Sequence, residues 1–102
     1  MRQVSWPVIV RPLAEQNLCE AQTWYEQKQT GLGVEFLAAV NTVFQQISGQ
    51  LLQYPLVYRQ LRRAVLRRFP YLIYFRAGTD RVEVVACLHS KRSSRLIEAR
   101  SR

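Results

Sequence analysis

The sequence predicts a two-layer α+β domain in which an antiparallel sheet packs on a helical hairpin. Three observations lead to this fold class: a short β-branched run near the N-terminus, two stretches with the apolar period of an amphipathic helix, and alternating apolar runs in the C-terminal third. The predicted element order is β-α-α-β-β-β. The 102 residues lie within the size range of one domain, so we expect residues 1–102 to fold as a single unit.

The first strand is expected at residues 8–10, a β-branched run that follows Pro7 and is closed by Pro12. From residue 13 the apolar period changes. Ala14, Leu18 and Ala21 lead to Tyr25 in steps of four, three and four, which is typical of one face of a helix that ends before Gly31. The sequence therefore passes from a strand directly into an amphipathic helix.

A second helix is expected after the glycines at 31 and 33, up to the Tyr54-Pro55 pair. Its apolar positions recur at three- and four-residue steps, and a short turn would bring it back antiparallel to the first helix. The helix aromatics are expected in the core, namely Trp24, Tyr25, Phe36 and Phe44.

Three strands are expected after the helices. Residues 61–68 alternate imperfectly, because Arg62 and Arg63 fall on opposite parities, whereas residues 71–76 and 82–89 alternate well. Residues 77–81 contain Gly, Thr and Asp, so they suit the turn of an antiparallel hairpin. Residues 93–100 are compatible with one or two helical turns capped by Ser93 or Ser94. We expect the sheet face away from the helices to be free for a partner.

The charge indicates an anionic partner. The chain has a net charge of +8, and all but two of its 15 basic residues are arginine. Arginine forms planar, bidentate contacts with phosphate or carboxylate groups, so nucleic acid and an acidic protein segment are both candidate partners. Five arginines lie within ten residues that contain no acid, and we expect them to bind that partner: Arg59, Arg62, Arg63, Arg67 and Arg68. Lys91 and Arg92 form a second basic cluster.

The sequence predicts no metal and no cofactor. Cys19 and Cys87 lie far apart and match no zinc-binding spacing, so both are expected to be small buried residues of a reducing compartment. The N-terminus lacks the apolar stretch of a secretory signal, and no apolar run approaches 18 residues. We therefore expect a cytoplasmic protein with no membrane partner.

The residues offer cations in abundance but few proton-transfer groups. Metal-independent RNA cleavage needs a base, a cation and an acid. His89 is the only histidine, which excludes a two-histidine mechanism. Near Lys91 and Arg92 it is either a general base or a structural and partner-contact residue. The other proton-transfer candidates are Glu83, Lys91, Tyr71 and Tyr74, and strand aromatics among the basic clusters are candidates for base stacking: Tyr58, Phe69, Tyr71, Tyr74 and Phe75.

Several of these features, in this order, resemble the ParE/RelE superfamily of toxins from bacterial type II toxin-antitoxin systems. They are the Ala14-x3-Leu18-x6-Tyr25 helix pattern, the glycine hinge before Phe36, the Tyr54-Pro55 helix end, the Arg68-Phe69-Pro70-Tyr71-x2-Tyr74 strand entry and the His89-x2-Arg92 strand exit. The resemblance implies a RelE/ParE-like fold. It also implies a cognate antitoxin with an acidic C-terminal segment.

The resemblance implies two alternative activities. ParE-like toxins stabilise plasmids and arrest growth by inhibiting DNA gyrase, and the Phe-Pro-Tyr entry and His-x-x-Arg exit favour this branch, which makes the protein a non-enzyme. RelE-like toxins cut messenger RNA on the ribosome. RelE-like toxins typically carry a basic residue near the start of the central strand and an acid-base Tyr or His near the C-terminus. This chain departs from that pattern, with Tyr71 or Leu72 at the first position and Glu98 or its neighbours at the second, and Arg92 alone matches. If the chain is a ribonuclease, the catalytic candidates are Arg67, Arg68, Tyr74, His89 and Arg92. A third hypothesis is a non-toxic basic nucleic-acid-binding or adaptor domain.

Overall fold

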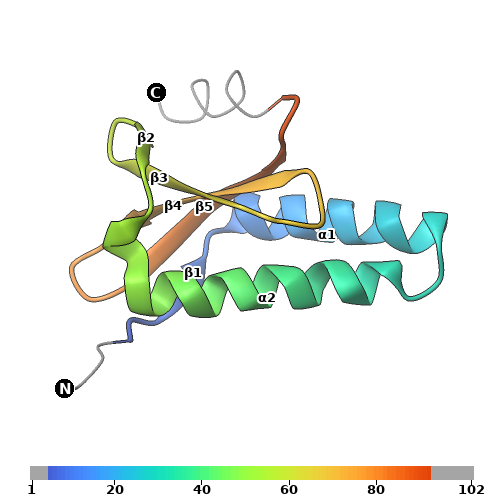
Figure 1. Ribbon diagram of the computed structural model, residues 1–102, viewed down its shortest axis with the longest axis horizontal. Coiled ribbons are helices and arrows are strands. Elements are labelled where there is room, and N and C mark those ends of the chain that lie inside the picture. The colour runs from blue at the N-terminus through green and yellow to red at the C-terminus, as the bar shows by residue number, and fades with distance from the viewer. Residues whose placement is uncertain (1–4, 93–102) are drawn as a thin grey trace.

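The structure is a computed structural model of the chain. It describes residues 5–92. A five-stranded sheet forms one layer, and two antiparallel helices cover one of its faces (Figure 1). The elements in chain order are β1 (Val8–Val10), α1 (Pro12–Lys28), α2 (Leu32–Gln50), the 3-10 turn η1 (Leu51–Gln53), β2 (Leu56–Tyr58), β3 (Leu61–Val65), β4 (Tyr71–Ala77) and β5 (Val82–His89). The predicted fold class, α+β with two layers, is confirmed.

The sheet is mixed rather than wholly antiparallel. Its strand order is β1-β5-β4-β3-β2, and β1 pairs parallel to β5 at the edge, with Val8 opposite Val82 and Val10 opposite Val84. A helical hairpin follows β1 rather than a tight turn, so the connection does not force β1 to run antiparallel to a neighbour. The remaining pairs, β2–β3, β3–β4 and β4–β5, are antiparallel.

The predicted strand over 61–68 is shorter than expected, and an additional strand precedes it. β3 ends at Val65 because residues 66–70 form a compact loop, closed by hydrogen bonds from the Leu66 N–H to the Tyr71 carbonyl (3.1 Å) and from the Tyr71 N–H to the Phe69 carbonyl (2.7 Å). β2 has three residues, too few for alternation to reveal it in the sequence. The expected helical turns at 93–100 lie outside the described residues.

The main core lies between the helices and the sheet. It joins Phe36, Val40 and Ile47 of α2 to Ile73 and Phe75 of β4, all at most 2% exposed. Ala14, Ala21 and Tyr25 bury the predicted face of α1. The first helix therefore packs as its apolar period indicates, against α2 and β5.

The other face of the sheet is also apolar and buried, so the expectation of a free outer face is wrong. Residues of a second cluster alternate with residues of the main core along β4 and β5, and Leu61 of β3 joins them: Leu61, Leu72, Tyr74, Ala86 and Leu88. Two further expectations are corrected. Trp24 is 52% exposed and Cys19 is exposed, because both lie outside the buried face of α1. No helix among residues 5–92 is long and apolar enough to cross a bilayer.

Candidate functional site

A groove of about 570 Å³ opens between α1 and the ends of β4 and β5. Its lining side chains come from three separate parts of the chain, within residues 17–25, 70–71 and 87–92. Its polar lining carries both signs of charge, since Glu20 comes from α1 and Arg92 follows β5. The full lining consists of Asn17, Glu20, Ala21, Trp24, Tyr25, Pro70, Tyr71, Cys87, Leu88, His89 and Arg92.

The register of the β4–β5 hairpin places two of these residues opposite each other. Tyr71, the first residue of β4, pairs with His89, the last residue of β5. Their rings meet edge to face with centroids 5.4 Å apart, and the Ser90 N–H donates to the Pro70 carbonyl at 2.8 Å. Pro70 has no N–H to donate, so it fits at the edge of the ladder. The hairpin end therefore fixes one wall of the groove.

Tyr25 and Tyr71 form the floor of the groove and belong to an aromatic cluster of the main core. The Tyr25 ring lies 4.9 Å from Phe69 and 6.1 Å from Tyr71, and Phe36 lies 5.3 Å from Phe69 and 5.4 Å from Tyr71. These edge-to-face contacts join α1, α2 and the β3–β4 loop. The floor is therefore a rigid part of the core. On the rim, the exposed Trp24 ring carries the Lys28 ammonium 4.8 Å from its centroid.

The titratable groups of the floor are held in their neutral forms. Burial raises the pKa of the Tyr71 phenol, as does the Cys87 thiol nearby, and Arg92 partly offsets this rise. Burial also raises the pKa of Tyr25, and it raises the pKa of Cys87 to about 12. Neutral phenols and a neutral thiol are poor bases and nucleophiles. The floor therefore offers shape and hydrogen-bond donors rather than a reactive anion.

His89 is positioned by the chain that follows it. Its Nδ1 accepts a hydrogen bond from the Lys91 N–H at 3.1 Å, and its carbonyl accepts one from the Arg92 N–H at 3.0 Å. Within residues 5–92 these are the contacts that orient the histidine, together with the Tyr71 ring. No carboxylate among the described residues hydrogen-bonds to the imidazole.

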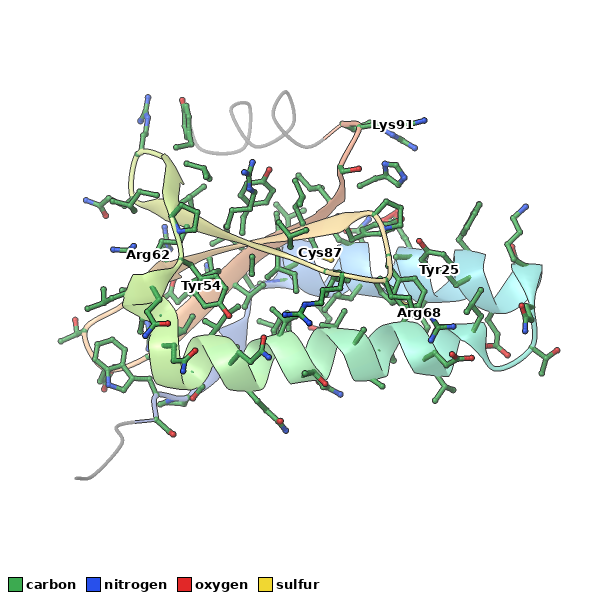
Figure 2. The ribbon with its side chains drawn as sticks, in the orientation of Figure 1. Tyr25, Tyr54, Arg62, Arg68, Cys87 and Lys91 are labelled. Atoms are coloured by element: carbon green, nitrogen blue, oxygen red, sulfur yellow. The ribbon has the colours of Figure 1, made fainter. Side chains whose placement is uncertain are left out.

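The structure brings together some of the predicted site residues and separates others (Figure 2). His89 and Arg92 share the groove, and Lys91 lies next to them at the strand end. Tyr74 is only 2% exposed and belongs to the second apolar cluster. Arg68 lies in the β3–β4 loop, where its guanidinium pairs with the Glu35 carboxylate at the start of α2. Arg67, in the same loop, is exposed.

The other predicted binding arginines differ in their surroundings. Arg62 donates from Nη1 to the Tyr54 carbonyl at 2.6 Å, so it ties β3 to the end of η1 (Figure 2). Arg63 has a buried Nε with no hydrogen-bond partner. Arg59 occupies the left-handed region, with φ at 53°, in the β2–β3 turn, and its guanidinium lies 5.3 Å from the centre of the Tyr58 ring. Some of the predicted binding arginines are therefore engaged in contacts within the protein, and only the others are free to bind a partner.

Glu83 has a structural environment. It is 7% exposed, and its carboxylate accepts hydrogen bonds from Arg76 at 2.7 Å and 3.0 Å and from Arg81 at 3.1 Å. These hydrogen bonds hold the pKa of Glu83 below its usual value. Both guanidiniums therefore keep Glu83 ionised at the turn of the β4–β5 hairpin, at the far end of that hairpin from His89.

Sequence reasoning missed the contribution of α1 to the groove. Glu20 and Trp24 are four residues apart, so they lie on one side of the helix, directly beside the buried Ala21 and Tyr25. Asn17 adds a structural contact, because its Oδ1 accepts a hydrogen bond from the Cys87 N–H at 3.2 Å. The available signal was that Trp24 falls outside the apolar stripe formed by Ala14, Leu18, Ala21 and Tyr25. Residues 5–92 contain no group of three or more His, Cys, Asp or Glu side chains that could hold a metal.

Comparisons with known proteins agree with this geometry. Residues 8–94 match the family model described as the ParE toxin of the type II toxin-antitoxin system parDE. A solved structure titled "Chromosomal ParDE TA system from P. aeruginosa" superposes with a TM-score of 0.62, covering 83% of this chain and 96% of that chain at 16% identity, which shows a shared fold. No curated protein sequence matches the chain.

Proposed function

Because the chain belongs to the ParE toxin family of the parDE type II toxin-antitoxin system, we propose that it arrests growth by binding a protein target, DNA gyrase, without covalent chemistry of its own. Membership of this family implies an antitoxin partner. In this proposal the partner presents an acidic C-terminal segment, the pair acts in the cytoplasm, and its biological role is plasmid stabilisation.

The neutral state of the Tyr71 phenol and the Cys87 thiol in the groove is the observation that carries the proposal. The Tyr71 phenol and the Cys87 thiol both have a raised pKa, and His89 has no carboxylate partner among residues 5–92. Acid-base catalysis of RNA cleavage requires a group that accepts a proton near neutral pH and a second that returns it. The Tyr71 phenol and the Cys87 thiol supply no proton acceptor of this kind, and His89 has no carboxylate partner among the described residues to orient it as a base, which supports a groove that holds a side chain of a protein partner.

The exposed cations suit the proposed antitoxin. Arg67, Lys91 and Arg92 are exposed and belong to no ion pair among the described residues, whereas Arg68 is neutralised by Glu35. A charge-assisted hydrogen bond contributes about 1.5 to 3 kcal/mol where it is desolvated and much less at a wet rim. We therefore expect the free cations to contribute more to antitoxin affinity than Arg68.

A RelE-like ribonuclease is the second candidate, and one observation favours it. His89 and Arg92 share the groove, so an imidazole and a guanidinium could meet one phosphate. In this alternative Arg92 binds the scissile phosphate, with Arg67 and Arg68 assisting from the loop, and His89 moves a proton. Tyr74 does not reach a substrate in the groove because it is buried.

Two assays on the purified chain separate the candidates. We expect inhibition of gyrase supercoiling and no cleavage of ribosome-bound message. Cleavage of the message, with supercoiling unaffected, would reject the gyrase proposal. The ribonuclease candidate predicts in addition that His89→Ala and Arg92→Ala abolish cleavage, while Arg11→Ala, which removes an exposed cation outside the groove, retains it.

Growth of a host that expresses the chain without its antitoxin tests toxicity itself. We expect arrest, reversed by co-expression of the antitoxin. Normal growth at a good yield of folded protein would instead support the non-toxic basic binding domain.

A further inference from the structure

One face of this basic protein carries no charge. Residues 36–58 contain no Asp, Glu, Lys, Arg or His, although 22% of the chain is charged and its net charge is +8. At that composition a stretch of this length would carry several charges. The uncharged stretch begins one residue after Glu35, which pairs with Arg68, and ends at Arg59 in the β2–β3 turn.

The exposed members of this stretch lie on the side of α2 that faces away from the sheet and continue through η1 into β2. In Figure 1 the α2 part of this surface forms the lower edge of the molecule, and the chain then rises at the left from the end of α2 to β2. We call it the neutral face, and it consists of Ala38, Asn41, Thr42, Gln45, Gln46, Gln50, Leu52, Gln53 and Leu56, all exposed. Leu52 and Leu56 are 73% and 56% exposed, so the neutral face includes large apolar side chains.

The neutral face is hollowed and keeps its hydrogen-bonding groups available. One hollow of about 320 Å³ is lined by Thr42, Gln45, Gln46, Gly49 and Gln50, and a second of about 490 Å³ lies between α2 and β1, beside Trp6 and Asn41. Within residues 5–92 the structure gives no hydrogen bond to the side-chain amides of Gln45, Gln46 or Gln50. Each amide therefore has donors and an acceptor for a partner.

We propose that the neutral face is the surface through which two copies of this chain associate. Two molecules of charge +8 repel each other, and burying an unpaired arginine between them would add a large desolvation cost. The neutral face avoids both costs, because none of the residues that form it is charged. Side-chain amides also suit a two-fold axis. The amide of one copy can donate a hydrogen bond to the same amide of the other copy and accept one from it.

The shape of the neutral face fits a helix from a second copy. From Ala38 to Gln50 the helix runs for about 18 Å, and its outer side has Ala38, Thr42 and Gly49 at positions where small side chains allow close approach. Leu52 and Leu56 extend the contact beyond the helix and supply apolar area. An acidic antitoxin segment gains no charge pairing here, so it is better matched to Arg67, Lys91 and Arg92.

Salt dependence gives the proposal a distinctive signature. Association through uncharged surfaces is opposed by the net charges around them, and salt screens this repulsion. We therefore expect the free chain to form a dimer with a dissociation constant on the order of micromolar. The dimer should become tighter as the NaCl concentration rises from about 0.05 to about 0.5 M. Binding of an acidic segment to arginines would show the opposite trend.

Sedimentation velocity of the full-length chain from about 1 to 100 μM is the test, with Gln46→Lys as the variant and Gln27→Lys as the matched control. Both changes replace an exposed helical glutamine with lysine, but Gln27 lies on α1, outside the neutral face. We expect Gln46→Lys to weaken dimerisation about tenfold or more and Gln27→Lys to change it less than twofold.

Three results would overturn the proposal. The first is a chain that stays monomeric at the highest concentration in both salts. The second is equal weakening by Gln46→Lys and Gln27→Lys. The third is a monomeric chain whose antitoxin binding or gyrase inhibition is lost with Gln46→Lys alone, which would assign the neutral face to that partner.

Discussion

The carboxylate of Glu26 caps the second helix by accepting a hydrogen bond from the N–H of Gly33 at 2.9 Å. Its other oxygen accepts one from the N–H of Gly31, also at 2.9 Å. Gly31 has φ at 89° and ends the turn, and no side chain of α2 itself caps that helix. One side chain near the end of α1 therefore satisfies two free N–H groups at the start of α2 and fixes the helical hairpin.

Glu26→Ala removes this cap and should lower the free energy of unfolding by about 1 to 2 kcal/mol, as loss of an N-cap does. Chemical denaturation monitored by circular dichroism measures the effect. Gln27→Ala is the control, because its side chain is exposed and makes no such bond. Equal destabilisation by the two variants would contradict the role of Glu26.

Gly33→Ala should destabilise the hairpin by about 1 to 3 kcal/mol, because the helices approach too closely for a methyl group. A Cβ at this position would lie 2.9 Å from the Gln22 carbonyl oxygen and 2.9 Å from Glu26 Oε1. The Gln22 oxygen belongs to the backbone of α1, so the two helices must move apart. A melting temperature equal to that of the parent protein would show that the hairpin relaxes without cost.

Arg62→Ala and Arg67→Ala should have separate effects on stability and binding. Arg62 donates to the Tyr54 carbonyl in a partly buried position, so its loss should cost about 1 to 2 kcal/mol of stability. Arg67 is exposed and should leave stability within about 0.5 kcal/mol while weakening the antitoxin complex. Thermal denaturation and titration calorimetry measure the two effects. The reverse pattern would show that the loop arginine, rather than the strand arginine, is structural.

Glu83 should make stability depend on acid pH. Hydrogen bonds from Arg76 and Arg81 lower its pKa in the folded protein below the ordinary value of 4.5, so its contribution is complete above that value. The contribution is lost as the pH falls through the lower folded pKa. The denaturation midpoint should therefore drop on acidification, and Glu83→Gln should flatten that part of the profile. An unchanged profile in the variant would assign the acid sensitivity to other carboxylates.

The two cysteines should differ sharply in reactivity. Cys19 is exposed, whereas Cys87 is 2% exposed and burial raises the pKa of its thiol to about 12. A thiol reagent at pH 7.5 should therefore label one cysteine in the native protein and two after unfolding, since the thiolate is the reactive form. Cys19→Ser should abolish native labelling. Two equivalents of rapid labelling in the native state would show that the core around Cys87 opens readily.

The local apolar pattern was sufficient to predict the elements that bury one continuous face. Val82–His89 and the buried face of α1 were predicted because their periods, two and 3.6 residues, are set by backbone geometry. The period of α1 did not reveal that Trp24 would face a groove, since its exposure depends on what β4 and β5 place opposite it. β2 was missed because three residues are too short to define a period.

The sequence by itself determined the fold class, the helical hairpin, the β4–β5 hairpin and the excess of arginine, because each depends on composition or on residues close in the chain. Only the tertiary structure decided which of those arginines are free. It paired Arg68 with Glu35, directed Arg62 to Tyr54 and left Arg67 exposed, and it brought Glu20 of α1 to the same groove as His89 and Arg92. The Arg68–Glu35 pair and the groove join residues far apart in the chain, and their geometry is set by helix-on-sheet packing that no local pattern encodes.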